Sequence, residues 1–143
     1  MINSILLVDD EDLFHIVFDD VCSLLNITLS LETCYSTDEA EEKFINWCAN
    51  ENSKPPCAFI DLNIIGSSFD GIELIRKVNR EYGNNIVIGI ISSSVDSVEI
   101  EKAKSVGAMF WIVKSDNLEP RLEKFYQDFP KYQNKTKEFT VYK

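Results

Sequence analysis

The 143-residue sequence has little of what builds metal–thiolate sites. It holds four cysteines and a single histidine, His15, and no Cys-x-x-Cys motif occurs. A structural zinc site is not expected, because such sites draw their ligands from closely spaced cysteines and histidines. The thiols are instead expected to be reduced and mostly packed, as is usual for proteins of the cytosol.

Long apolar runs and basic segments are also missing. No apolar run approaches the roughly 20 residues that cross a bilayer, and the residues around the N-terminus, Met1–Ser4, include no lysine or arginine. Neither a membrane span nor a secretory signal is therefore predicted. These absences favour a cytoplasmic protein without a membrane partner.

Positive charge is scarce in one half of the chain. Residues 1–60 contain two lysines against twelve acidic residues, whereas residues 61–143 hold twelve of each sign, which together give a net charge of -10. No basic stripe is visible, so direct nucleic-acid binding is not expected. The length and the hydrophobic fraction of 45% suit one globular domain with its own core.

Three short apolar runs are present, and each ends in charged residues. The first leads into Asp9 and Asp10, the second into Asp61 and the third into Lys114. Continuous apolar runs are typical of buried parallel strands, and in open α/β sheets the functional residues lie just beyond the carboxyl ends of such strands. The pattern therefore predicts that three carboxylates and one ammonium group share a pocket.

Such a pocket has a definite chemistry. Three close carboxylates repel one another unless a cation joins them, and Mg²⁺ suits oxygen ligands while leaving room for water and phosphate. The lysine would then be available to an anion. This combination is the outline of a phosphoryl-transfer site.

Apolar periodicity along the chain alternates between strand-like and helix-like segments. The predicted strands are 4–9, 28–35, 57–61, 86–91 and 109–114, and the predicted helices are 12–26, 37–51, 71–82, 96–105 and about 117–129. A chain of such units forms a parallel sheet with helices on both faces, joined by right-handed crossovers. We therefore expect an α/β doubly wound fold over residues 1–130, followed by a weakly ordered polar tail, 131–143.

The sequence resembles the receiver domains of two-component response regulators, in the stand-alone form of the chemotaxis regulators, over residues 3–129. The matching features are Asp9-Asp10, Asp61, a hydroxyl residue at Ser92, Gly107-Ala108 and Lys114 with the aromatic Trp111 three residues before it. Because all of them occur in order and at strand ends, the resemblance is specific. It implies a flavodoxin-like sheet of five strands in the order 2-1-3-4-5, with five helices.

The resemblance also implies roles for these residues. Asp61 would accept a phosphoryl group from a phosphohistidine on a sensor histidine kinase or a histidine phosphotransfer protein. Mg²⁺ would be bound by Asp10, Asp61 and the backbone carbonyl of Asn63, and by Asp9 through water. Lys114 would pair with Asp61 and then with the phosphoryl oxygens.

The switch is expected at Ser92, which would turn toward the phosphoryl group while Trp111 repacks behind it. Ser93 is the alternative to Ser92, since the serines form a run. The signal would pass to a downstream protein that the sequence does not identify. The protein would thus be a regulatory phosphoacceptor and not an enzyme, apart from catalysing its own phosphorylation and dephosphorylation.

The sequence departs from the family pattern near the site. Ile65 stands where the family usually has proline, Gly71 follows Asp61 by ten residues where eight is usual, and Ser115 replaces the proline that usually follows the lysine. The loop after Asp61 is therefore expected to be about two residues longer. These differences concern the shape of the loops and not the identity of the acceptor.

Two other functions are compatible with parts of the pattern. One is a pseudo-receiver, a protein-binding module that works without phosphorylation; the loop differences favour it, and the complete acidic set with Lys114 opposes it. The other is a haloacid-dehalogenase-like phosphatase, which also uses an aspartate at a strand end. That family needs a second aspartate two residues later, where this sequence has Asn63.

Overall fold

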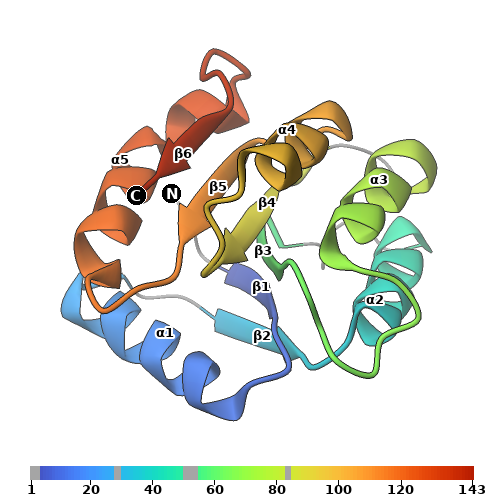
Figure 1. The fold of residues 1–143 in the computed structure, drawn as a ribbon, viewed down its shortest axis with the longest axis horizontal. Coiled ribbons are helices and arrows are strands. Elements are labelled where there is room, and N and C mark those ends of the chain that lie inside the picture. The colour runs from blue at the N-terminus through green and yellow to red at the C-terminus, as the bar shows by residue number, and fades with distance from the viewer. Residues whose placement is uncertain (1–3, 28–29, 50–54, 83–84) are drawn as a thin grey trace.

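A six-stranded parallel sheet forms the centre of the protein, which is described here from a computed structural model covering residues 4–27, 30–49, 55–82 and 85–143. The strand order is β2-β1-β3-β4-β5-β6 (Figure 1). The strands are β1 (Ser4–Val8), β2 (Ser30–Cys34), β3 (Cys57–Asp61), β4 (Val87–Ser92), β5 (Phe110–Val113) and β6 (Thr140–Tyr142). The helices are α1 (Asp12–Leu24), α2 (Thr37–Ala49), α3 (Gly71–Glu81), α4 (Ser97–Ser105) and α5 (Leu118–Gln133).

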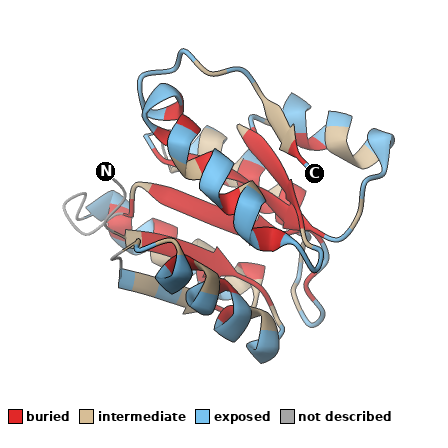
Figure 2. Ribbon diagram, turned by 90° about the vertical axis from the view of Figure 1, so that its left-hand side faces the viewer, coloured by how far each residue is buried: buried red, intermediate tan, exposed pale blue. Residues whose placement is uncertain are grey.

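Helices cover both faces of the sheet (Figure 1). α1 and α5 pack on one face, where the core includes Phe18, Phe59 and Phe125, and α2, α3 and α4 pack on the other around residues such as Phe44. Successive side chains of a strand point to opposite faces, so strands with both faces covered must be apolar throughout. The buried central strands and the exposed outer sides of the helices are visible in Figure 2.

The sequence prediction of a flavodoxin-like α/β fold is confirmed, with the predicted order for the first five strands and five helices. Most predicted boundaries agree to within one or two residues. The proposed start of the second strand at residues 28–29 and the proposed end of the second helix at 50–51 lie outside the described residues. None of the helices in the described part of the chain has both the length and the hydropathy of a membrane span.

The number of strands is a correction to the sequence prediction. We expected five strands and a weakly ordered tail over 131–143, but α5 continues to Gln133 and residues 140–142 add β6, parallel to β5. The sequence signal was weak because β6 has only three residues and the segment before it is polar. Its pairing with β5 and its packing on α5 define it, and neither is visible in a local pattern.

Packing explains why α5 passes through Pro130. A proline inside a helix removes one backbone hydrogen bond and crowds the preceding turn. Here Phe129 and Tyr132, on either side of it, are both buried, and this burial offsets the cost. The Tyr132 hydroxyl lies 2.8 Å from that of Tyr142, which donates to Asp128 at 2.8 Å, so the end of α5 and β6 are joined by buried hydrogen bonds.

Candidate functional site

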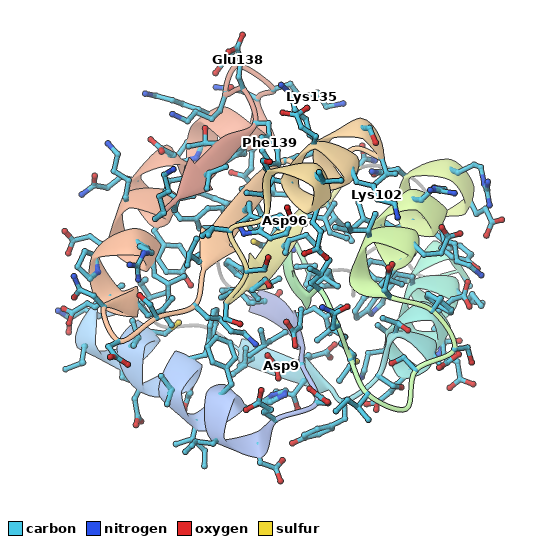
Figure 3. All side chains as sticks on the ribbon, in the orientation of Figure 1. Asp9, Asp96, Lys102, Lys135, Glu138 and Phe139 are labelled. Atoms are coloured by element: carbon cyan, nitrogen blue, oxygen red, sulfur yellow. The ribbon has the colours of Figure 1, made fainter. Side chains whose placement is uncertain are left out.

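The carboxyl ends of β1, β3 and β5 bring together the four charged residues that the sequence singled out. Val8 pairs with Ile60, so Asp9 and Asp61 leave neighbouring strands side by side. The Asp9 label in Figure 3 marks this end of the sheet. The Asp9 backbone N–H donates to the Cys34 carbonyl of β2 at 3.0 Å, which fixes the turn where the chain leaves β1.

Three carboxylates form the acidic part of the site. One oxygen from each of Asp9, Asp10 and Asp61 lies within 4.8 Å of the others. Asp9 is completely buried, Asp61 is 8% exposed and Asp10 is half-buried. Oxygen ligands at this spacing, with one of them reachable from solvent, fit a hard divalent cation such as Mg²⁺ or Mn²⁺.

Lys114 supplies the positive charge next to this cluster. Its Nζ donates to Asp9 Oδ2 and lies 3.4 Å from Asp61 Oδ1. The same ammonium lies 4.2 Å from the centre of the Phe14 ring, a cation–π contact that supports it from the α1 side. A single lysine thus bridges the two buried carboxylates.

Burial and charge together set the acidity of Asp61. Loss of hydration raises its pKa from an ordinary value of 3.8 to about 6, with Lys114 opposing this change and Asp9 adding to it. One ammonium does not fully compensate three carboxylates, because each charge held away from water loses hydration. The cluster therefore keeps a net negative charge, which favours the binding of a further cation.

Backbone N–H groups hold each carboxylate in place. Asp9 Oδ1 accepts from Glu11 at 2.9 Å, Asp10 Oδ2 accepts from Ile65 at 3.1 Å, and Asp61 Oδ1 accepts from Leu62 at 2.9 Å. The bond from Ile65 joins the loop after β3 to the loop after β1. The position where the family usually has proline thus contributes an N–H, which proline could not do.

His15 is a supporting residue that the sequence reasoning missed. A single polar residue in a helix is usually on its surface, but His15 is 7% exposed, and its Nε2 donates to the Asp9 carbonyl at 2.7 Å. Its ring stacks on Tyr35 with the centroids 4.7 Å apart. The helical position of His15 next to buried Phe18 was the available signal, but it did not show that the residue contacts the acidic turn.

Ser92 and Trp111 lie near the site but make contacts of their own. Ser92 ends β4 and is buried, and its Oγ accepts from the Ser94 N–H at 3.1 Å. Trp111 is completely buried in β5 and donates from its indole Nε1 to the Ser94 carbonyl at 3.0 Å. The alternative residue, Ser93, is exposed. The two predicted switch residues are thus joined through Ser94.

The longer loop after Asp61 runs from residue 62 to residue 70. Asn63 is exposed on it, and the role of its carbonyl as a metal ligand stays a prediction. The loop ends where Asp70 caps α3 by accepting from Glu73 N–H at 2.8 Å. Among the described residues no peptide bond is cis, so Lys114–Ser115 is trans.

Gly71 links this loop to Asp61. Its N–H donates to the Leu62 carbonyl at 2.9 Å, and a Cβ added at this position would lie 2.2 Å from the Asp61 carbonyl oxygen. Helix α3 can therefore approach the end of β3 only because residue 71 has no side chain.

The substitution Gly71→Ala is expected to destabilise the protein by about 1–3 kcal/mol, since the new methyl group must displace backbone. Equilibrium urea unfolding measures this change. Ile65→Ala is a matched control in the same loop, because the Ile65 side chain is 86% exposed, and it should change the free energy of unfolding by less than about 0.5 kcal/mol. Equal effects of the two substitutions would contradict the close approach at Gly71.

Comparison with protein families gives one match. The family model described as the response regulator receiver domain matches residues 5–124. A comparison with curated proteins finds no match.

Solved structures of similar fold are numerous. The phosphorylated cyanobacterial phytochrome response regulator RcpA is 20% identical, with a TM-score of 0.71 over 95% of this chain and 96% of that one. A CheY-like receiver domain protein from Methanospirillum hungatei is 18% identical, with a TM-score of 0.72 over 94% and 99%. The Mn²⁺-bound form of the response regulator Rcp1 is 21% identical, with a TM-score of 0.65 over 92% and 90%. At these identities the likeness shows the fold.

Proposed function

The chain belongs to the response regulator receiver domain family, and from this membership we propose that it is a phosphoacceptor of a two-component phosphorelay. Asp61 would take the phosphoryl group from a phosphohistidine of a sensor histidine kinase or a histidine phosphotransfer protein. The observation that carries the proposal is the meeting of Asp9, Asp10 and Asp61 beside Lys114 at one end of the sheet.

The transfer itself needs little covalent help from the protein. A carboxylate oxygen of Asp61 forms the new P–O bond while the P–N bond to the imidazole breaks, and the imidazole leaves with that electron pair. Catalysis of such a step is mainly positioning and neutralisation of charge on the phosphoryl oxygens. The Leu62 N–H bond to Asp61 Oδ1 helps to aim the carboxylate.

Two positive charges would share the neutralisation. Asp10, Asp61 and the Asn63 carbonyl would hold Mg²⁺, with Asp9 acting through water, and the ion would supply positive charge to the phosphoryl oxygens. Lys114 would supply further positive charge, because its ammonium already lies 3.4 Å from Asp61 Oδ1. When Asp61 becomes an acyl phosphate, the lysine can keep Asp9 and pair with a phosphoryl oxygen.

The new group would be sensed through Ser92. Phosphorylation adds acceptor oxygens and roughly 1.5 to 2 negative charges, so the Ser92 hydroxyl can donate to it. Ser92 Oγ now accepts from the Ser94 N–H, and Ser94 also holds Trp111 through its carbonyl. We propose that movement of Ser92 shifts the loop at Ser94 and so the surroundings of Trp111, which presents a changed surface to a downstream protein.

Beryllofluoride binding tests this proposal, because the compound mimics an aspartyl phosphate. We expect fluorine NMR to show a bound signal that requires both Mg²⁺ and Asp61, and tryptophan fluorescence to change with it. Asp116→Asn is a control, since Asp116 is exposed on the β5–α5 loop, and it should bind as the unaltered protein does.

A bound signal that survives Asp61→Asn would place the acceptor elsewhere. Absence of any Mg²⁺-dependent signal would favour the pseudo-receiver, a module that binds partners without phosphorylation.

A further inference from the structure

A basic groove runs between α5 and β6, although the protein as a whole is strongly acidic. Its volume is about 320 Å³. The residues that line it are Pro120, Arg121, Lys124, Asp128, Lys137, Thr140, Val141, Tyr142 and Lys143. Four basic side chains thus face one acidic side chain, in a chain whose net charge is -10. We call this the α5–β6 groove; Figure 1 shows the two elements side by side.

The single acidic side chain in the groove, Asp128, is already engaged. Asp128 accepts from the Tyr142 hydroxyl at 2.8 Å and lies 3.5 Å from Lys137 Nζ. Burial would raise its pKa, but Tyr142 together with Lys137 and Lys124 holds the pKa below its ordinary value. Asp128 therefore stays ionised and neutralises about one of the four cations.

The remaining cations have donors to spare. Arg121 Nη1 donates to the Asn117 carbonyl at 2.8 Å, which uses one of the several N–H donors of a guanidinium group. Within the described part of the chain, no carboxylate lies within 4.0 Å of the charged nitrogens of Arg121, Lys124 or Lys143. An acidic ligand would find charge in this groove that the protein does not use itself.

The groove also follows an open sheet edge. β6 pairs with β5 on one side and ends the sheet on the other, within the residues that the structure describes. All three residues of β6 and Lys143 line the groove, and because side chains of a strand alternate between its faces, we infer that the groove follows the edge of β6. Unpaired strand edges accept an added strand from another chain.

We propose that the α5–β6 groove binds an acidic peptide segment of a partner protein, in extended form, as a strand added beside β6. Main-chain hydrogen bonds to the edge would give affinity, and the cations would select the side chains. The inference does not depend on phosphorylation of Asp61, because none of the groove residues belongs to the phosphoacceptor site.

The spacing of the cations suits this occupant. Arg121 and Lys124 lie one turn apart on α5, which places their Cβ atoms about 5–6 Å apart. Alternate residues of an extended strand lie about 6–7 Å apart on one face, a difference that the long basic side chains can span. A sequence with acidic residues at every second position is therefore the expected ligand.

A nucleic acid is a less suitable partner. Nucleic-acid affinity depends on many phosphate contacts, and four cations on a chain of net charge -10 provide few of them against a repelling background. A nucleic acid would also form no strand-like main-chain hydrogen bonds with the β6 edge.

The probe for the test is a fluorescent twelve-residue peptide that alternates glutamate and valine. We expect fluorescence anisotropy to show binding that weakens with salt, and NMR to show shifts of the 140–143 amides. The double substitution Arg121→Glu/Lys124→Glu should raise the Kd at least about tenfold, because two attractive contacts become repulsive. Binding should persist in Asp61→Asn.

Three comparisons decide the result. Lys102→Glu/Lys104→Glu makes the same change of net charge on α4, away from the groove (Lys102 in Figure 3), and should change the Kd less than about twofold. Methylation of alternate peptide nitrogens, which keeps the charge, should weaken binding about tenfold by removing main-chain donors. A peptide with lysine in place of glutamate should not bind.

The proposal is overturned if the peptide does not bind or if the two double variants lose affinity equally. It is also overturned if methylation of the peptide nitrogens leaves the Kd unchanged. Equal or tighter binding of a single-stranded oligonucleotide would also overturn it. If circular dichroism shows that Arg121→Glu/Lys124→Glu is unfolded, the milder variant Lys124→Gln decides, and an unchanged Kd in that variant overturns the proposal.

Discussion

Asp61→Asn is expected to stabilise the protein by about 3 kcal/mol near neutral pH in the absence of divalent metal. In the folded protein the Asp61 pKa is raised from 3.8 to about 6, first by burial and then by Asp9, against the opposing effect of Lys114. Each pKa unit corresponds to about 1.4 kcal/mol. Asparagine has nearly the same shape and no charge to bury, so the substitution removes this cost.

The pH dependence gives the prediction its sign. A carboxyl whose pKa is higher in the folded state holds its proton more tightly there, so the protein loses stability as pH rises from about 4 to about 6. The advantage of Asp61→Asn should thus be absent below about pH 4, grow between these values and stay constant above about pH 6. Urea unfolding at several pH values measures it.

Controls distinguish this effect from a general loss of negative charge. Asp116→Asn removes an exposed carboxylate from the same end of the molecule and should change stability by less than about 0.5 kcal/mol at any pH. Saturating Mg²⁺ should make the unaltered protein more stable than Asp61→Asn, because binding of the ion stabilises the folded state of the protein that binds it well. If the stability difference between Asp61→Asn and the unaltered protein did not depend on pH, the raised pKa of the buried Asp61 carboxyl would be contradicted.

The second large effect is expected on metal affinity. Asp10→Asn should weaken Mg²⁺ binding about 10–100-fold, since the site loses one of three carboxylates and a neutral amide binds the ion less strongly. Asp10 is only half-buried, and its bond to the Ile65 N–H can be replaced by the amide oxygen of asparagine. The loss should therefore come from charge and not from a collapsed loop.

Isothermal titration with MgCl₂ measures the affinity. Asp12→Asn is the matched control, because Asp12 begins α1 two residues later and is exposed; it should change the Kd less than about twofold. If both variants bound Mg²⁺ as the unaltered protein does, Asp10 would not be a ligand, and the acidic cluster would lose its proposed role.

The charged residues could be placed from sequence because strand order and strand ends follow from strong rules. Asp9, Asp61 and Lys114 each end a continuous apolar run, and parallel strands bring such ends to one edge. The strand order alone therefore predicts that these three residues lie together, whatever the conformation of the loops. Gly71 could likewise be read as the start of α3, although its contact with the Asp61 carbonyl could not.

Features that depend on tertiary contacts escaped the sequence. His15 looked like a surface residue because a single polar residue in a helix usually is one, but its side chain bonds to the Asp9 carbonyl across the turn between β1 and α1. β6 escaped for a related reason: its three residues are defined by pairing with β5 and by the Tyr142–Asp128 bond. Pro130 on its own predicts the end of a helix, but the burial of Tyr132 beyond it stabilises the last turn of α5.

The proposed switch residues could be predicted from the sequence in part. Ser92 and Trp111 were identified by their positions after β4 and within β5, and the structure joins them through Ser94. The sequence did not indicate that the Trp111 side chain is completely buried. This burial makes the loop at Ser94, more than a large swing of the indole ring, the proposed element of movement.

The most direct test of the central claim is the intact mass of the protein after incubation with acetyl phosphate and Mg²⁺. The account predicts the gain of one phosphoryl group, located at Asp61 by fragmentation, and its loss when Mg²⁺ is chelated beforehand or Asp61 is replaced by asparagine. No gain under any condition, or a gain that persists in Asp61→Asn, would contradict it.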